Sequence, residues 1–235
     1  MDTFLYPSTI AYAPGEQPHT ATLTVEPLFH GYGTTIGNTL RRTLLSSLPG
    51  GALTAIKIKG ASHEFTTLTG IKEDAVELTL NLKAIALKVY SDLPVRLTLR
   101  KSGVGVVTAG DFAPNADVEV INPDAVIATI TDESGTLELE AMASKGFGYV
   151  PTEERENEEL EAGWIKLDAL FSPVKTVSFR VEATRVGEIT NYDKLVMDIE
   201  TNGVLTPEEA VAQSTDIIMN HFRLLAGRGM EGTTP

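Results

Sequence analysis

The sequence predicts an α+β fold in which a subdomain built from both ends of the chain carries an inserted, β-rich subdomain. Each end combines alternating strand patterns with one long, broadly apolar helix pattern, and the middle has short strand patterns without helical periods between them. Strands of that kind indicate a mixed or antiparallel sheet. We therefore expect residues 1–50 and 173–235 to form one subdomain, with two long helices packed on a sheet, and residues 51–172 to form the other.

The first helix is predicted within residues 31–50, GYGTTIGNTLRRTLLSSLPG, and should run for about four turns. Two glycines give the backbone a flexible entry, and Thr34 or Thr35 can cap the helix start. Pro49 and the two glycines after it forbid its continuation.

This helix has two different sides. At about 100° per residue, an apolar arc with Leu45 at its edge gathers Ile36, Gly37, Leu40, Thr43, Leu44 and Leu48. Asn38 and Arg42 fall on the opposite side, and Arg41 lies on the other flank of the arc. Two interpretations remain open. The helix is either an ordinary core helix with two solvated arginines, or one that packs both on its own subdomain and on a partner, with arginine at the rim.

Strand patterns recur along most of the chain. They lie at Ser8–Ala13, Thr20–Leu28, Ala52–Lys59, Trp164–Leu170, Val174–Val186 and Leu195–Glu200, and in short runs between Ile85 and Ala143. Glu73–Lys83 is ambiguous, because its apolar residues fit both a strand and a helical face. Its acidic first turn and terminal lysine suit the helix dipole, so we favour a helix there.

A second long helix is predicted over Thr206–Ala226. Thr206 as N-cap, Pro207 at the first helical position and Glu209 at the third form a capping box with a proline start. Its apolar stripe consists of Val211, Ile218, Phe222 and Leu225, widened by Ile217 and Leu224.

A strongly acidic block lies between Glu153 and Glu161, with six glutamates and one arginine. Such a block predicts a solvated, mobile loop. Closely spaced acids without a turn-forming Gly among them make a poor calcium loop, so a metal site is not expected there.

Composition excludes several classes of function. Without cysteine the chain has no disulfide, thiolate nucleophile or cysteine-ligated metal, and its four histidines show no ligand-like spacing, so we expect neither metal nor cofactor. No apolar run approaches the roughly 20 residues of a membrane span. The first residues, MDTFLYPSTI, lack the basic segment followed by an apolar segment that begins a signal peptide. Together these two observations predict a cytoplasmic protein. The net charge of −13 argues against direct binding of nucleic acid.

Three functional hypotheses remain on the residues alone. The first is a dimeric scaffold without chemistry of its own. The second is an enzyme that holds a phosphate on Gly31-Tyr32-Gly33 at a helix start, although these glycines are spaced GxGxxxG and no βαβ pattern surrounds them. The third is a β-rich adaptor.

Five separated motifs resemble the amino-terminal domain of the bacterial RNA polymerase alpha-subunit family. They occur in the family's order along nearly the whole chain: VEPL followed by residues 31–50, GIKEDAVELTLNLK at 70–83, GFGYVP at 146–151, FSPV at 171–174 and ETNGVLTPEEAV at 200–211. The resemblance implies a homodimer, formed through the first and last helices, that binds the beta and beta-prime subunits and seeds polymerase assembly. The chain would then belong to a nucleotidyltransferase only as a non-catalytic subunit.

The resemblance also implies roles for particular residues. The dimer interface would use Ile36, Leu40, Leu44, Ile218, Phe222 and Leu225 from the two apolar arcs. Arg42 and Leu45 fall on the family's beta-binding positions, and Asn38 shares their side of the helix. Lys83 and Val174 fall on positions linked to beta-prime contact, and the inserted subdomain would face the large subunits. The resemblance also implies that residues 72–83 are helical. It does not say which copy of the chain binds which large subunit.

The chain ends in GRGMEGTTP, which suits the beginning of a linker. Members of the family continue through a linker into a carboxy-terminal domain that touches promoter DNA and activators. Either such a domain has been excised or the subunit is naturally short. In both cases we expect no direct DNA binding by this part.

Overall fold

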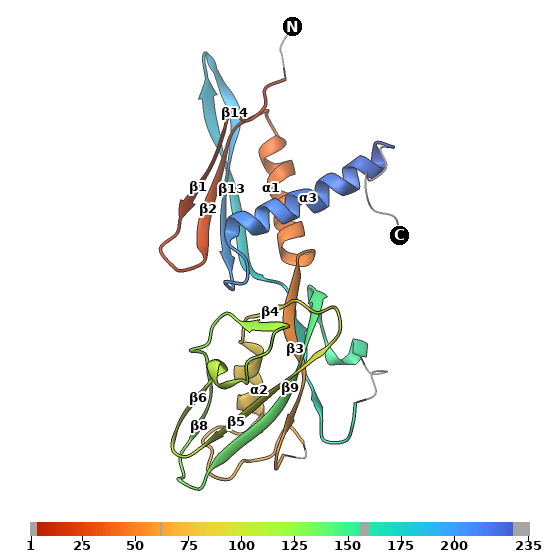
Figure 1. The fold of residues 1–235 in the computed structure, drawn as a ribbon. Helices are drawn as coiled ribbons and strands as arrows, with labels where there is room; N and C mark the ends of the chain where they lie inside the picture. Colours follow the sequence, from red (N-terminus) through yellow and green to blue (C-terminus); the bar gives the residue numbers. More distant parts are fainter. Residues whose placement is uncertain (1–3, 62, 156–159, 228–235) are drawn as a thin grey trace. The chain divides into compact units, whose positions relative to one another are not determined.

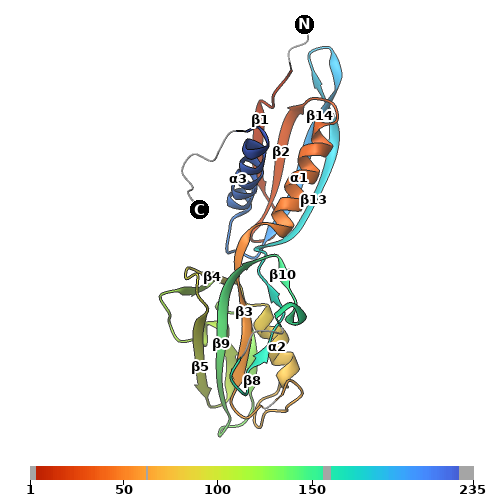
Figure 2. The same cartoon turned by 90° about the vertical axis from the view of Figure 1, so that its right-hand side faces the viewer.

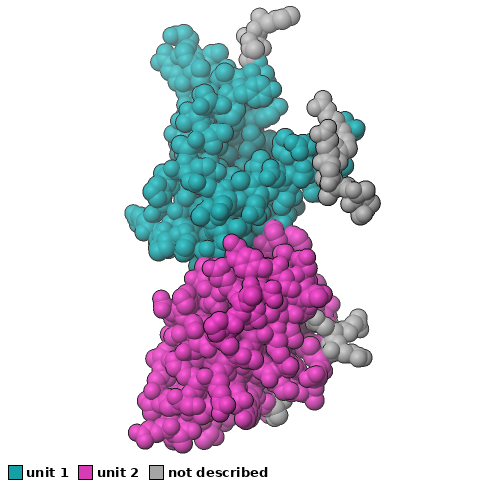
Figure 3. Space-filling model, viewed as in Figure 1, with its two compact units in different colours: residues 1–48, 173–235 teal, residues 49–172 magenta. Residues whose placement is uncertain are grey.

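A computed structural model describes residues 4–61, 63–155 and 160–227. The chain is α+β, with mostly strands and three α-helices in the described residues. It divides into two compact units (Figure 3): unit 1 comprises residues 1–48 and 173–235, and unit 2 comprises residues 49–172. Unit 1 is therefore assembled from both ends of the sequence. The first boundary falls two residues before the expected one, because the strand predicted from Ala52 already begins at Pro49.

Unit 1 contains a four-stranded antiparallel sheet in the order β1-β2-β14-β13. Its strands are β1 (Thr9–Pro14), β2 (Thr20–Leu28), β13 (Val174–Val186) and β14 (Ile189–Thr201). Alternate residues of the central strands, such as Leu23 and Met197, are buried on one face, as the alternation predicts. β14 begins six residues earlier than predicted, since Ile189–Lys194 pairs in the hairpin with β13 although it lacks the apolar alternation.

Helix α1 (Tyr32–Ser46) lies against this sheet (Figures 1 and 2). Gly37 permits the close approach: a Cβ atom there would lie 2.7 Å from Cδ2 of Phe179 and 2.9 Å from Cδ1 of Leu195. Leu40 and Leu44 fill the core on the same side. The prediction that Thr34 or Thr35 caps the helix start is wrong. Gly31 is the N-cap residue, and the N-cap residue makes no side-chain hydrogen bond to the helix.

Replacing Gly37 with alanine is expected to destabilise unit 1 by up to about 2 kcal/mol. The steric cost of inserting a methyl group into a packed contact, about 1 to 3 kcal/mol, exceeds the gain in helix propensity of about 1 kcal/mol. The change would be measured by urea denaturation. Asn38→Ala, on the exposed side of the same turn, is the control and should change stability by less than about 0.5 kcal/mol. A Gly37→Ala variant at least as stable as the wild type would contradict this packing.

Helix α3 (Pro207–Leu225) begins as predicted. The side chain of Thr206 accepts a hydrogen bond from the Glu209 amide, and the Glu209 side chain returns one to Thr206, which completes the capping box. In the first half of the helix, Ala210, Val211 and Ser214 are buried. The second half extends away from the sheet of unit 1 (Figure 1).

Unit 2 is built around a sheet with the strand order β5-β9-β3-β4-β7, in which β11 also pairs with β3. Its elements are β3 (Pro49–Ile58), α2 (Ala75–Lys83), β4 (Leu87–Val89), β5 (Val95–Ser102), β6 (Gly105–Thr108), the 3₁₀ helix η1 (Ala109–Asp111), β7 (Val118–Val120), β8 (Val126–Ile130), β9 (Thr136–Phe147), β10 (Tyr149–Val150), the 3₁₀ helix η2 (Thr152–Arg155), β11 (Ile165–Lys166) and β12 (Ala169–Leu170). Two further ribbons pair β6 with β8 and β10 with β12.

The ambiguous segment of unit 2 is the helix α2. Asp74 caps it by accepting a hydrogen bond from the amide of Glu77, 2.8 Å away, and Leu78 and Leu82 are fully buried in the core of the unit. The leucines therefore follow the helical face rather than the strand alternation.

The strand predicted over Trp164–Leu170 is instead two short strands, β11 and β12, because the chain leaves β3 after Leu167 donates its amide to the carbonyl of Thr54. The acidic block starts in η2, and residues 156–159 lie outside the described part of the chain.

Candidate interaction surfaces

The end of α3 exposes a group of large apolar side chains in unit 1. Met219, Phe222, Leu224 and Leu225 occupy its last two turns with 45%, 58%, 56% and 82% of their surface exposed. These side chains do not contribute to the buried core of the unit in the described residues. Water contact over so many large apolar groups is unfavourable, and clustered exposure of this kind marks an interaction surface.

The six residues predicted for a dimer interface lie in three different environments. Leu40 and Leu44 are buried in the core of unit 1, with 8% and 0% of their surface exposed, so a partner cannot reach them while the unit stays folded. Ile36 and Ile218 are half-buried at the edge of that core, and Phe222 and Leu225 are exposed. The apolar arc of α1 is thus used mainly inside its own unit.

An aromatic cluster beside the start of α1 was not predicted. The ring of Phe4 lies 5.4 Å from that of Phe29 and 5.2 Å from that of Tyr32, and Phe29 also meets Tyr192 at 6.4 Å. Phe4, Phe29 and Tyr32 remain roughly half exposed. Phe29 and Tyr32 are close in the sequence, so a contact between their rings could have been predicted. Their contacts with Phe4 and Tyr192 could not, because these depend on the tertiary fold.

The N-terminus of α1 is held by Asp193, a buried carboxylate on β14. Its Oδ2 atom accepts hydrogen bonds from the amides of Gly31 and Gly33, at 2.9 and 3.0 Å. The register of β14 against β2 shifts between Asp193 and Leu195, and such irregularities re-aim side chains. The amides that could have held a phosphate are therefore already bonded to a carboxylate of the same chain.

The outer side of α1 carries the predicted beta-binding residues. Asn38 and Arg42 are exposed, Leu45 is half-buried, and the guanidinium of Arg42 makes no hydrogen bond or ion pair within the described ranges. Arg41 differs, because its Nε atom donates to the carbonyl of Val177 at 3.2 Å. One arginine of the pair thus supports the fold, and the other is free to bind.

The two positions linked to beta-prime lie in different units. Val174 is only 4% exposed, in the core of unit 1. Lys83, the last residue of α2 in unit 2, places its Nζ atom 2.9 Å from Oδ2 of Asp168, whose Oδ1 accepts from the amide of Thr152 at 3.0 Å. The Lys83 side chain, followed by the Thr152 amide, holds the pKa of Asp168 below its ordinary value.

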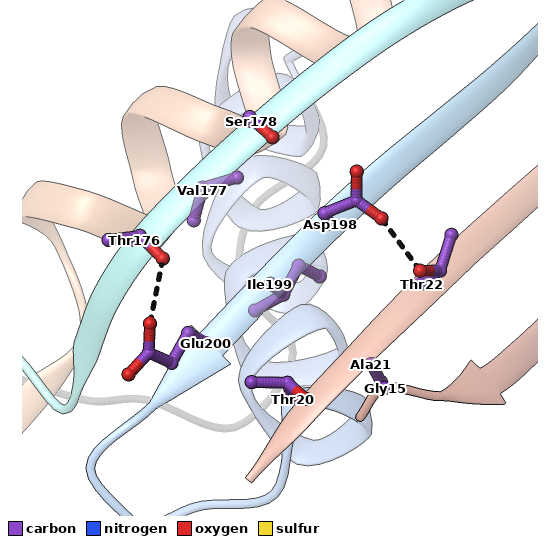
Figure 4. Close-up of a pocket in the computed structure, with 10 residues that line it drawn as sticks. All are labelled: Gly15, Thr20, Ala21, Thr22, Thr176, Val177, Ser178, Asp198, Ile199 and Glu200. Carbon is purple, nitrogen blue, oxygen red and sulfur yellow. Dashed lines mark hydrogen bonds between the residues drawn. The ribbon is translucent and has the colours of Figure 1, made fainter. Parts of the chain in front are cut away.

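A hollow of about 320 Å³ lies on the sheet of unit 1 (Figure 4). Two of its hydroxyl groups donate to carboxylates, Thr22 to Asp198 at 2.6 Å and Thr176 to Glu200 at 3.2 Å. Arg180 neutralises part of this charge through an ion pair with Asp198. Neither histidine nor cysteine lines the hollow, so nothing in it beyond these hydroxyl–carboxylate pairs points to an active site.

The described residues contain neither a candidate metal site nor a candidate membrane span. Across 4–61, 63–155 and 160–227, no three His, Asp or Glu side chains are grouped so that they could hold a metal ion. No helix in these ranges is long and apolar enough to cross a bilayer.

Comparisons with known proteins identify both the inserted unit and the family. Residues 56–172, nearly all of unit 2, match the family described as the RNA polymerase Rpb3/RpoA insert domain. Unit 2 is thus an insert domain of the polymerase-subunit class. The chain belongs to the bacterial RNA polymerase alpha-subunit family, as its five motifs indicated.

Individual relatives are similar to this chain over most of its length. It is 49% identical over 203 residues to "DNA-directed RNA polymerase subunit alpha" of Oceanobacillus iheyensis and 48% identical over 203 residues to the protein of that name in Moorella thermoacetica. Each alignment covers 86% of this chain and 64% of the relative. A third relative of that name, from Symbiobacterium thermophilum, is 49% identical over 200 residues, which are 85% of this chain and 63% of the relative. The chain therefore spans about two thirds of the length of the curated relatives it matches.

Proposed function

We propose that this chain is a homodimeric scaffold on which RNA polymerase assembles, through one surface for its twin and others for the beta and beta-prime subunits. The chain itself would perform no chemistry, and nucleotidyl transfer would be the activity of the assembly. Relatives named as alpha subunits of DNA-directed RNA polymerase support this role. No contact with DNA is proposed for this part of the protein.

The exposed end of α3 is the observation that carries the proposal. Phe222 and Leu225 lie one turn apart on the helix, and both are more than half exposed. A symmetric dimer presents the same patch twice, so a single apolar helix end can supply both sides of the interface. Ile36 and Ile218, at the margin of the core, would extend this surface.

The outer side of α1 is proposed to bind the beta subunit through Asn38, Arg42 and Leu45. The guanidinium group of Arg42 has its five donors available, and its planar fork can bind carboxylates or carbonyl groups in a bidentate manner. Leu45 is half-buried and adds apolar area beside it.

Replacing Arg42 with alanine is expected to weaken binding of the beta subunit by roughly 30-fold, since a central arginine anchor is typically worth about 2 kcal/mol. The measurement is titration of the purified full chain against the beta subunit. Stability and solution mass should not change, because Arg42 bonds to nothing else in the described residues of its own chain.

Arg41→Ala is the matched control, since it removes the same charge from the neighbouring residue. It should lower stability, through the lost bond to Val177, and leave beta binding within about threefold. Equal loss of binding in both variants would indicate non-specific attraction to a basic helix and would contradict the assignment of Arg42.

The alternative of a phosphate-binding enzyme is not favoured. Both amides that a phosphate would need at the start of α1, those of Gly31 and Gly33, donate to the carboxylate of Asp193. A phosphate would have to displace an anionic side chain that is only 8% exposed.

A further inference from the structure

The outer face of the sheet in unit 2 carries a charge opposite in sign to that of the whole chain. The strands β5, β9 and β3 are neighbours in this sheet (Figure 1), and on each of them charged residues alternate with buried apolar ones. Four cations and two carboxylates share the face that points away from the core, whereas the chain has 19 basic and 32 acidic residues. We call these six residues the cationic face: Lys57, Lys59, Arg96, Arg100, Glu138 and Glu140.

Glu138, on the central strand β9, lies between cations from both sides. It is paired directly opposite Arg100 on β5, and its Oε2 atom is 2.9 Å from Nζ of Lys59, just after the end of β3. The hydrogen bond from Lys59 holds the pKa of Glu138 below its ordinary value, and the charge of Arg100 acts in the same direction. This carboxylate is therefore already compensated by the protein.

Glu140, the second carboxylate of the face, is held in a similar way. Its Oε2 atom lies 2.6 Å from Nη2 of Arg96 on β5, and it is paired opposite Lys57 on β3. The guanidinium carbon of Arg96 lies 5.2 Å from the ring centroid of Trp164, a cation–π contact that orients the arginine toward the sheet. Arg96 and Lys59 are thus used within the chain.

The other two cations of the face have no such partner. Neither Lys57 nor Arg100 makes a hydrogen bond or ion pair with any of the described residues. Lys57 is half-buried and lines a hollow of about 340 Å³ together with Gly60 and Gly163. A Cβ atom at Gly163 would lie 3.5 Å from Cε of Lys57, so the stem of this lysine is packed. Little side-chain entropy would therefore be lost when its ammonium group binds an anion.

We propose that the cationic face binds an acidic segment of a protein partner, whose carboxylates pair with Lys57 and Arg100. Complementary charge selects this occupant, because two cations remain unpaired on a face of net positive charge. The two residues lie two strands apart and two positions out of register, which places their Cα atoms about 12 Å apart. Carboxylates spread along an extended segment match that separation better than one small anion does. The inference does not depend on the proposed function.

Nucleic acid fits this face less well. Affinity for a phosphate backbone comes from many lysine and arginine contacts, and only two cations are unpaired here. The net charge of −13 also repels a long polyanion from the rest of the chain.

The face is tested by titrating the full chain into a fluorescein-labelled peptide of about eight glutamates, with fluorescence anisotropy as the measurement. Binding is expected at about 50 mM salt and should weaken at least about tenfold at 0.5 M salt, because salt screens exposed charges. The emission of Trp164, the only tryptophan, should change when unlabelled peptide is added, since its ring contacts Arg96 in this face. A wild-type chain that does not bind the peptide at low salt would refute the proposal.

Lys57→Glu should raise the dissociation constant for the peptide at least about tenfold, because like charges then face each other. Lys57→Gln, which only removes the charge, should raise it about threefold, and it replaces the glutamate variant if that variant fails to fold. Lys72→Glu is the matched control. Lys72 is an exposed lysine of unit 2, in the segment before α2, and its variant should bind within about twofold of the wild type. Equal weakening by Lys57→Glu and Lys72→Glu would overturn the assignment to the cationic face.

Two competitors decide between the acidic segment and other anions. If inorganic phosphate at about 10 mM displaces the peptide at constant ionic strength, the face holds a small anion and the assignment to a segment is wrong. If single-stranded DNA of equal charge binds more tightly than the peptide, the occupant is nucleic acid and the assignment to a protein is wrong. A peptide displaced by neither, and weakened by Lys57→Glu alone, is the expected result.

Discussion

Replacing Phe222 with aspartate is expected to halve the solution mass, from about twice 25.3 kDa to 25.3 kDa. Phe222 is 58% exposed and Leu225 is 82% exposed at the end of α3, so a charge there costs the isolated chain almost nothing. In a dimer built on this helix end, the same charge would be buried twice without a partner, at a cost of several kcal/mol. Light scattering across a dilution series to sub-micromolar concentration measures the effect.

Two controls make this experiment specific. Ala212→Asp introduces the same charge at an exposed position in the first half of α3 and should leave the dimer intact. The circular dichroism spectrum of Phe222→Asp should match that of the wild type. Leu44→Asp is not informative, because Leu44 is fully buried in its own unit and the variant would lose its fold before it lost a partner. A wild-type chain of 25.3 kDa at micromolar concentration would contradict the dimer.

Replacing Asp193 with alanine is expected to lower the stability of unit 1 by about 3 kcal/mol. Two amides, those of Gly31 and Gly33, lose a charged acceptor, and each such bond is worth about 1.5 to 3 kcal/mol. The loss is largest at Gly33, whose backbone is buried at the helix start. Urea denaturation followed by far-ultraviolet circular dichroism, at one protein concentration, measures the change.

Asp193→Asn is the matched variant, because it keeps an oxygen acceptor and removes the charge that favours a helix N-terminus. It should lose less than half as much stability as Asp193→Ala. Trp164, the only tryptophan, lies in unit 2, and its fluorescence serves as an internal reference. Equal stability of Asp193→Ala and the wild type would show that Asp193 does not hold the helix.

Local patterns in the sequence were enough for most of the secondary structure. The strands Thr20–Leu28 and Val174–Val186 have the predicted bounds, because alternating apolar residues are buried on one face of a sheet wherever that sheet lies. The start of α3 was predictable for a similar reason, since Thr206, Pro207 and Glu209 satisfy the helix start within four residues. The family could also be recognised from the sequence, because five motifs occur in the family's order.

The sequence by itself therefore determined the fold class, the two apolar helices and the family, all of which depend on neighbouring residues or on motif order. Only the tertiary structure decided how those elements are used. It showed that Leu44 fills a core whereas Phe222 stays exposed, although both lie on apolar helix faces. It also supplied the cap of α1 from Asp193, more than 150 residues away, and paired Lys83 with Asp168. Burial and pairing are set by whichever segments the fold brings together, and no pattern within one segment records them.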